Sequence, residues 1–585
     1  MDDIRMAAFR AKRDWFQTIW KYRQDGIALI ERAKFPEVTI SACTEIGQVE
    51  EDIVVPLQRI YTGKKPVISS SLANTPCTTL GLHGLLERLN TTLSTSHTLD
   101  NPSLSSLLEG YIAKKYDFGT AYGSLRTAWY TEDWSKIPYR LRECEEKDRE
   151  MRHTALHGGR IVDLWIYPRR VWDLFSNRVV PIWSTGTDYP APISHAWVDE
   201  HERNDEWTPI NGREWPVPVP KDTNLERIRI EMLNMDLEYV WLDILCLRQR
   251  GGTREDLRAE EWMLDVPTIG FVYFTVDVYC YLSGLGRPLS VKPGYFDSDR
   301  CWFNRAWTLQ EIGLRNRKIC GITPDGPMDA KQDMDGNCET DILTIFHRRL
   351  QGMGKATHRI FDMLEEMRHR ASTNPVDKIA GMAFLLGSPT IPAYYESHSI
   401  EDAWEALMNT TDATMRGAVF FLYPEPGNAG TKWRPSWDQL MMKPLPRDYM
   451  PVDDYYFTHV ERDWKDNVDR CEALCIEKGF VRGLAVEGMP GADRHGELLV
   501  EDAHGTQHTF NVIATHPYVI AEDIYTLIGS GETFYSSSCQ WVQWVVGRRL
   551  SDGSFEKLSV LKMADDVDRS TLEDLAGEKR VNILI

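Results

Sequence analysis

The segment CWFNRAWTLQE, residues 301–311, places an acid, a base and two tryptophans within eleven residues. On a helix, Trp307 and Glu311 are i,i+4 neighbours and share a face, which would hold a carboxylate beside a flat aromatic ring. Arg305 lies near the start of the same helix. The alternative is a surface ion pair, because Glu311 is also i,i+4 to Arg315 in the favourable order. Periodicity alone favours the ion pair.

A second acid, Asp243, lies within the apolar run VWLDILCL. Burying a carboxylate without a partner costs several kcal/mol or more, so Asp243 must be paired or hydrogen-bonded. It either faces a binding crevice at the carboxyl end of a strand or ties down a neighbouring loop. Cys246 and Gln249 follow where the strand should give way to a loop, and a small buried side chain is typical of such a cysteine.

The run ISHAW contains Ser194, His195 and Trp197. On a strand, Ser194 faces one side, whereas His195 and Trp197 face the other. A serine hydrolase needs the serine and histidine side chains in contact, and strand neighbours do not achieve this easily, so we exclude that chemistry. The pair either lines a ligand site or includes a core histidine with a satisfied ring nitrogen.

Other motifs are weak. SGLGRPLS lacks the third glycine of a dinucleotide fingerprint, and no GxxxxGK[ST] occurs. No GxSxG nucleophile elbow is present. His153 and His157 are i,i+4 neighbours without a matching third ligand, so we expect no metal site.

Alternating strands and helices would position the candidate residues. Strands are expected at 191–198, 238–247 and 274–285, with a fourth at 318–322. Helices are expected at 221–235, 253–264 and 304–314, the first opened by a capping box of Thr223 and Glu226. This alternation predicts a parallel sheet covered on both faces, with ligands bound outside the carboxyl ends of the strands.

The chain divides into four expected regions. Residues 1–155 form a helical N-terminal region, 156–330 the α/β region, 331–470 a helical region with loops, and 471–585 a β-rich C-terminal domain. Within the last region, Cys471 and Cys475 have a spacing that suits a helix face rather than a metal-binding knuckle.

Composition limits the classes of partner. The 585 residues carry a net charge of -20, which repels phosphate backbones, so we expect no nucleic-acid partner. No run of about 18 apolar residues occurs and the N-terminus lacks a signal-peptide pattern, so we expect a cytoplasmic protein without a membrane span. The 11 cysteines are scattered, which favours reduced thiols.

Three ordered blocks resemble the fungal heterokaryon-incompatibility (HET) domain. PISHAW resembles its opening block, with His195 replacing the usual tyrosine and Val198 where glycine is common. EYVWLDILCLRQ is similar to the second block. CWFNRAWTLQE matches the third, with every motif position in place, namely Arg305, Trp307, Thr308, Gln310 and Glu311. The likeness covers about residues 160–320, and its context looks like the mushroom-type branch of the family.

HET domains are distantly similar to TIR (Toll/interleukin receptor) domains, so the resemblance implies a TIR/flavodoxin-like α/β core. Enzymatic TIR domains cleave the nicotinamide–ribose bond of NAD⁺, and the resemblance implies that Glu311 is the catalytic carboxylate of such a reaction. It also implies a role for the protein in programmed cell death or innate immunity. No cofactor is implied beyond NAD⁺, or a related nucleotide, as substrate. The residues then expected to line the substrate site are Ser194, His195, Trp197, Asp243, Cys246, Gln249, Arg305 and Trp307. The alternative is a non-catalytic TIR-like module that self-associates or binds a partner incompatibility protein.

Overall fold

The computed structural model describes residues 2–30, 33–130, 133–186, 189–311, 316–352, 359–446, 459–489, 491–530, 543–564 and 567–585. The chain forms two compact units. The first comprises Met1–Ala356, Arg370–Leu385 and Thr390–Ser397, and the second comprises Thr357–His369, Leu386–Pro389 and His398–Ile585.

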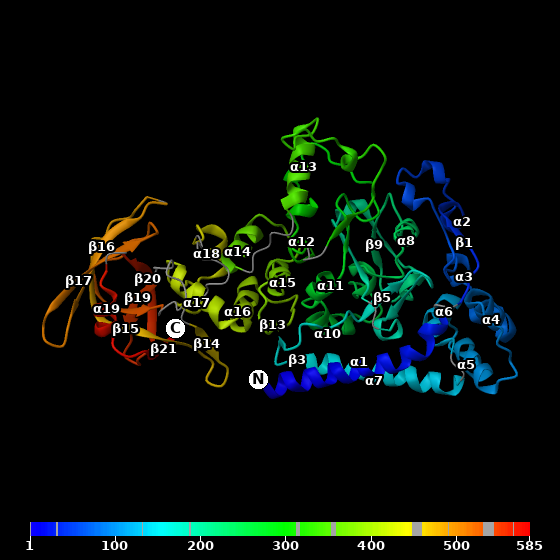
Figure 1. Cartoon of the computed structure of the whole chain (residues 1–585), viewed down its shortest axis with the longest axis horizontal. Coiled ribbons are helices and arrows are strands. Elements are labelled where there is room, and N and C mark those ends of the chain that lie inside the picture. Colours follow the sequence, from blue (N-terminus) through cyan, green and yellow to red (C-terminus); the bar gives the residue numbers. More distant parts are fainter. Residues whose placement is uncertain are drawn as a thin grey trace. The chain divides into compact units, whose positions relative to one another are not determined.

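Helices dominate the chain before residue 156. The elements there are α1 (Asp2–Ile30), β1 (Val38–Ser41), α2 (Ala42–Ile46), β2 (Ile60–Gly63), α3 (Ser70–Ala73), α4 (Cys77–Leu93), α5 (Pro102–Ala113), α6 (Phe118–Leu125) and α7 (Ile137–Ala155). Local signals start several of them: Asn101 caps α5, and Asp117 caps α6 by accepting from the Thr120 amide. Helix α1 lies along α7 (Figure 1), where the Tyr22 hydroxyl donates to Glu143.

A six-stranded mixed sheet forms the centre of the first unit. The elements of this region are β3 (Leu156–His157), β4 (Arg160–Ile161), β5 (Arg170–Asp173), β6 (Arg178–Pro181), β7 (Ala191–His195), β8 (Arg203–Glu206), β9 (Val217–Pro220), α8 (Leu225–Asn234), β10 (Tyr239–Trp241), α9 (Asp243–Cys246), α10 (Glu255–Asp265), α11 (Ile269–Thr275), β11 (Val278–Tyr281), α12 (Thr308–Glu311) and β12 (Arg317–Ile319). The strand order is β12-β11-β7-β10-β5-β6. Strands β10, β7, β11 and β12 are parallel, as the alternation predicted.

The first parallel strand, β7, lies between the second, β10, and the third, β11. The chain therefore moves to one side of β7 and then returns to the other side. In α/β sheets, ligands bind at the carboxyl ends of the strands beside such a switch in direction. The last residues of β7 are Ser194 and His195, so both lie at this edge of the sheet.

The structure corrects three local expectations. Strand β10 ends at Trp241 and Asp243 begins the short helix α9, so Asp243 is not a mid-strand acid. The sheet is extended by the antiparallel strands β5 and β6, which the alternation did not predict. Helix α8 is capped by Asn224, whose side chain accepts from the Arg227 amide, whereas the Thr223 hydroxyl donates to the carbonyl of Gly286.

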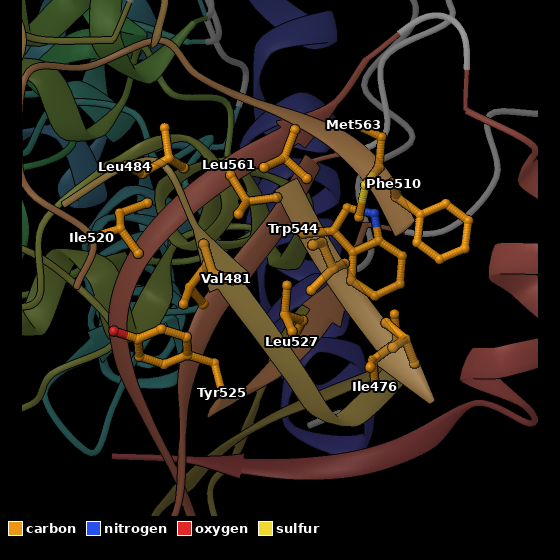
Figure 2. Close-up of a cluster of buried hydrophobic side chains, with 14 of the residues drawn as sticks. Ile476, Val481, Leu484, Phe510, Ile520, Tyr525, Leu527, Trp544, Leu561 and Met563 are labelled. Atoms are coloured by element: carbon orange, nitrogen blue, oxygen red, sulfur yellow. The ribbon is translucent and has the colours of Figure 1, made fainter. Parts of the chain in front are cut away.

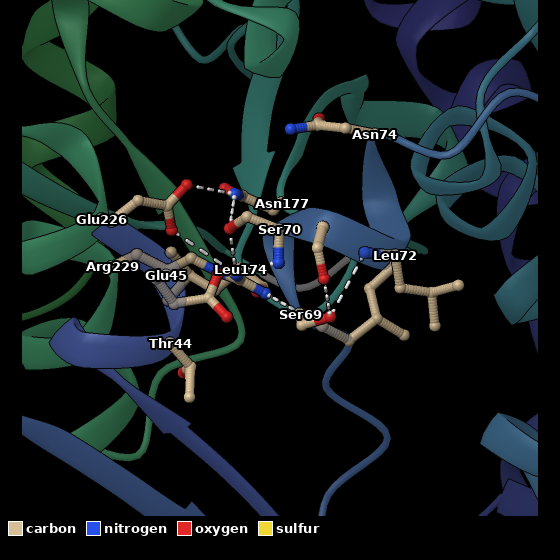
Figure 3. Close-up of polar contacts among 12 residues, drawn as sticks. Thr44, Glu45, Ser69, Ser70, Leu72, Asn74, Leu174, Asn177, Glu226 and Arg229 are labelled. Atoms are coloured by element: carbon tan, nitrogen blue, oxygen red, sulfur yellow. Dashed lines mark hydrogen bonds and ion pairs between the residues drawn. The ribbon is translucent and has the colours of Figure 1, made fainter. Parts of the chain in front are cut away.

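A buried arginine on α8 joins the N-terminal helices to the sheet (Figure 3). Arg229 is 0% exposed, and its guanidinium donates to the carbonyls of Ile68 at 2.6 Å and Leu174 at 2.8 Å. Glu45 and Glu226 lie within 3.8 Å and 3.6 Å and supply negative charge. The residues before 156 thus belong to the same packed unit as the sheet.

The remaining elements complete both units. The first unit also contains α13 (Asp341–Gly352), α15 (Asp377–Ala383) and β13 (Ile391–Pro392). The second contains α14 (Ile360–Arg368), α16 (Ile400–Thr410), α17 (Ala413–Leu422), α18 (Trp437–Met442), β14 (Val460–Asp463), β15 (Val468–Arg482), β16 (Arg494–Glu501), β17 (Gln507–Ala514), β18 (Asp523–Gly529), β19 (Gln543–Arg549), β20 (Phe555–Met563), α19 (Arg569–Ala576) and β21 (Arg580–Leu584).

The strands of the second unit pair in a closed ring. Strand β15 pairs with both β16 and β18, and the ladder runs β15-β16-β17-β20-β19-β18 back to β15, antiparallel throughout. Inward side chains such as Val481, Leu527 and Trp544 fill its core (Figure 2). Cys471 and Cys475 both lie on β15, so the helical interpretation of their spacing was wrong; period-2 alternation also puts residues i and i+4 on one face. No helix in the described ranges is long and apolar enough to cross a bilayer.

Candidate active site

A chain of hydrogen bonds holds Glu311 at the carboxyl end of β7. Trp302 Nε1 donates to Ser194 Oγ at 2.7 Å, and Ser194 Oγ donates to Glu311 Oε2 at 2.5 Å. An indole N–H can only donate, so it fixes the Ser194 oxygen as an acceptor and turns the hydroxyl hydrogen toward the carboxylate. Trp302 and Ser194 are both 0% exposed, whereas Glu311 is only partly buried and keeps access to solvent.

The motif residues around Glu311 anchor the turn that presents it. The Thr308 hydroxyl donates to the carbonyl of Trp302 at 2.7 Å and accepts from Arg370 Nη1 at 2.9 Å. The Gln310 amide, oriented so that both of its ends are satisfied, accepts from the Gly270 amide and donates to the carbonyls of Ala380 and Gly381. Helix α12 is thereby fixed against α11 and α15, and Glu311 is held by a rigid frame.

A second carboxylate lies on the other side of β7. His195 Nε2 is 2.9 Å from Asp243 Oδ1, Trp197 Nε1 donates to Asp243 Oδ2 at 3.1 Å, and the Ile244 amide donates to Oδ1 at 2.7 Å. Strand alternation explains the division, since Ser194 faces Glu311 while His195 and Trp197 face Asp243. His195 therefore serves Asp243 and not Ser194, so the two residues do not form a serine–histidine catalytic pair.

The two carboxylates have opposite protonation tendencies. Burial raises the pKa of Glu311 to about 7; the Ser194 hydrogen bond and the charges of His195 and Arg305 oppose the rise, whereas Asp243 adds to it. For Asp243, burial alone would raise the pKa, but the charge and hydrogen bond of His195 outweigh it and the pKa is lowered. The pKa of His195 is raised because the Asp243 carboxylate outweighs the effect of burial. Environments that separate the pKa values of two carboxyl groups are typical of acid–base pairs in active sites.

The two tryptophans of the motif make different contacts. The side chain of Trp307 hydrogen-bonds to Asp377, whereas Trp302 supplies the indole that contacts Ser194. The Glu311 amide does donate to the Trp307 carbonyl at 3.2 Å, so the expected helical turn is present. Arg315, the partner in the ion-pair alternative, lies outside the described residues.

The other predicted residues occupy different environments. Cys246 is 1% exposed, and burial raises the pKa of its thiol to about 12, which favours a core side chain over a ligand contact. The Gln249 amide donates to the carbonyls of Leu247 at 3.0 Å and Asp243 at 3.3 Å, closing the loop after α9. The Arg305 guanidinium makes long contacts within the described residues, at 3.4 Å to the Asp299 carbonyl and 3.5 Å to the Thr373 hydroxyl.

Arg305 belongs to a group of cations beside the site. Burial and the charge of Arg300 both lower the pKa of Arg305, and burial lowers the pKa of Lys378 despite the nearby Asp299. Arg300 is paired with Asp199 at 2.6 Å. No described acid forms an ion pair with Arg305 or Lys378 within 4 Å, although the charges of Asp377, Glu311 and Asp299 oppose the lowering of the Arg305 pKa.

Trp302 and a buried glutamate, Glu231, were not predicted from the sequence. Trp302 lies in the same motif as Glu311, so its residue type and position could have indicated that it belongs to the site. Glu231 on α8 is 0% exposed, and it accepts from Gln58 Nε2 and the Tyr281 hydroxyl at 2.7 Å each and from the Gly321 amide at 2.8 Å. Its partners lie 50 to 173 positions from it in sequence, so no local pattern predicts these contacts.

Within the described residues, no group of three or more His, Cys, Asp or Glu side chains could hold a metal ion. The geometry is instead that of a partly open carboxylate with a cationic rim. Comparison with models of known families, with curated proteins and with solved structures finds no match. The likeness to the HET domain therefore rests on the three sequence blocks.

Proposed function

We propose that this protein is a heterokaryon-incompatibility-type cell-death effector that cleaves the nicotinamide–ribose bond of NAD⁺. The proposal includes a TIR/flavodoxin-like core, supported by the parallel order β10-β7-β11-β12, with the first strand placed between the second and the third. The observation that carries the proposal is Glu311, a partly open carboxylate that accepts from the Ser194 hydroxyl at the carboxyl end of β7.

The chemistry suits a single carboxylate. Nicotinamide departs with the electron pair of the breaking C–N bond and becomes neutral, so the leaving group needs no strong acid. The ribose develops oxocarbenium character, which ionised Glu311 stabilises at short range. Water then bonds to the anomeric carbon and releases a proton, for which the carboxylate is the nearest acceptor. The products are nicotinamide, ADP-ribose and a proton.

The neighbouring groups have defined roles in this proposal. Ser194 and Trp302 orient the carboxylate, and Arg305 with Lys378 binds the phosphates of the substrate. Asp243, with a lowered pKa, stays ionised and attracts the cationic nicotinamide ring. A cationic substrate also lowers the pKa of Glu311 from about 7, so that binding favours the ionised form.

The decisive experiment incubates the purified full chain with NAD⁺ and measures free nicotinamide and ADP-ribose by chromatography. The wild type should release nicotinamide, whereas Glu311→Gln should not. Glu231→Gln is the matched control, because it removes a buried glutamate of the same unit outside the site. Arg305→Gln should raise KM several-fold with little change in kcat, as loss of a ground-state phosphate contact does.

Two outcomes would contradict the proposal. Equal release by folded Glu311→Gln protein would remove Glu311 from the mechanism. No release by the wild type at any protein concentration, including concentrations that force assembly, would leave the non-catalytic self-association module as the better interpretation.

A further inference from the structure

Helix α1 carries two separate apolar stripes. The inner stripe, formed by Ala8, Ala11, Trp15 and Ile19, is at most 6% exposed. It holds the helix on the first unit, with the ring of Trp15 at 5.2 Å from that of Tyr167 and Lys12 Nζ at 2.8 Å from Asp163. One face of α1 is therefore fully used by packing within the chain.

The outer stripe points to solvent. It consists of Met6, Phe9, Phe16 and Trp20, which are 48%, 55%, 40% and 44% exposed. With Arg13 as the middle member, the positions 6, 9, 13, 16 and 20 are spaced alternately by three and four residues. This is the a and d spacing of a helix that packs along a second helix. Phe16 and Trp20 already stack on each other, with ring centroids at 6.2 Å.

The form of the outer stripe favours a partner helix over a lipid surface. A bilayer takes a wide apolar face, whereas this stripe is a narrow two-per-heptad seam with the charged Arg13 at its centre. Insertion would bury that guanidinium among hydrocarbon.

The position of Arg13 favours a second copy of α1 in antiparallel orientation. In a parallel pair, the two copies of Arg13 would face each other across the twofold axis and repel. In an antiparallel pair, a positions face d positions, so each Arg13 meets Phe9 or Phe16 of the other copy. A guanidinium on an aromatic face is a favourable contact. We propose that the outer stripe of α1 is a homodimer interface formed by antiparallel packing of two α1 helices.

The size of this seam sets the strength of the association. Four large apolar side chains per copy form an interface below the roughly 1,200 Å² of total buried area that stable complexes need. The dimer therefore forms reversibly, in the micromolar range. Association through α1 requires no chemistry at Glu311, so this proposal can be tested independently of the proposed reaction.

Sedimentation velocity of the full chain over a series of concentrations tests the interface. The wild-type mass should rise from the monomer value of 67.4 kDa toward twice that value. Phe16→Glu should remain monomeric at every concentration, and Arg13→Glu should weaken association several-fold because a carboxylate is repelled by an aromatic face. Val54→Glu is the matched control: Val54 is also 55% exposed and in the same unit but not on α1, so its variant should dimerise like the wild type.

Folding of the variants is checked by circular dichroism, which should be unchanged because the substituted side chains are exposed. A wild type that stays monomeric throughout would overturn the proposal. If that monomer floats with phosphatidylcholine or phosphatidylserine vesicles and Phe16→Glu does not, the stripe is a lipid-binding face instead. Dimerisation that survives Phe16→Glu would place the interface elsewhere.

Discussion

Glu231 and Glu311 are two glutamates of the same unit, and burial raises the pKa of both. Glu231 is fully enclosed and accepts hydrogen bonds from three donors that belong to distant parts of the chain. Among the described residues, Ser194 alone donates a side-chain hydrogen bond to Glu311, which remains partly open. A raised pKa of a carboxyl group therefore does not by itself indicate a functional site. A carboxylate with spare acceptor capacity and an approach from solvent can act on a ligand, whereas a saturated one holds the fold together.

The sharpest way to break this comparison is Glu311→Gln. We expect kcat to fall about 10²–10³-fold, the loss typical of removing one group that stabilises transition-state charge. The fold should be retained, because the amide still accepts from Ser194. Nicotinamide release measures the first effect and thermal unfolding the second. A variant that unfolds while the active fraction keeps full turnover would make Glu311 a structural residue like Glu231.

Glu231→Ala should have the opposite profile. It leaves the donors of Gln58, Tyr281 and Gly321 buried without an acceptor, at about 1–3 kcal/mol each, so the free energy of unfolding should fall by at least about 3 kcal/mol. Urea unfolding measures the loss, with Glu231→Gln as the milder control. Activity per folded molecule should be unchanged, and a large drop in kcat for folded Glu231→Ala would erase the distinction.

Trp302→Phe tests the role of the hydrogen bonds from Trp302 to Ser194 and from Ser194 to Glu311. The ring is kept, but Ser194 loses the N–H that orients it, so kcat/KM at neutral pH should fall about tenfold, equivalent to about 1.4 kcal/mol. The weaker bond from Ser194 should raise the pKa of Glu311. The ascending limb of the pH profile should therefore move to higher pH, a shift that a purely structural defect would not produce.

A further expected effect concerns stability and pH. The pKa of Glu311 is higher in the folded chain, about 7, than its ordinary 4.5. Between these values the folded state keeps a proton that the unfolded state has released, so stability falls as pH rises through this window. The difference in unfolding temperature between the wild type and Glu311→Gln should change from pH 4.5 to pH 7 and then level off. A constant difference would mean that Glu311 titrates normally.

Sequence patterns predicted much of the sheet but not the connections around it. Buried β-branched runs located β7, β11 and β12, and alternation correctly separated Ser194 from His195. Asp243 was misplaced because an apolar run does not reveal where a strand ends and a helical turn begins. The strands β5 and β6 were not predicted; they pair with each other as neighbours in sequence, but the attachment of β5 to β10 depends on a distant partner.

The site residues stay predictions. Motif spacing singled out Glu311, and the structure joins Ser194 to Glu311 and His195 to Asp243 by hydrogen bonds. Helical spacing predicted a shared face for Trp307 and Glu311, but it could not indicate that the Trp307 side chain bonds to Asp377. Trp302 reaches Ser194 over 108 positions, a contact set by tertiary packing and not by local sequence.

The Arg229 contacts have a consequence for the order in which the chain acquires its structure. Ile68 is synthesised 161 positions before the guanidinium that binds its carbonyl. The N-terminal helices therefore leave the ribosome early but cannot complete their docking until α8 has been made. Contacts between residues so far apart in sequence slow folding, because the entropy cost of closing the loop precedes the stabilisation that the contact provides. We expect the N-terminal helices of the nascent chain to keep apolar surface exposed until α8 has been synthesised. This segment should therefore depend most on chaperones.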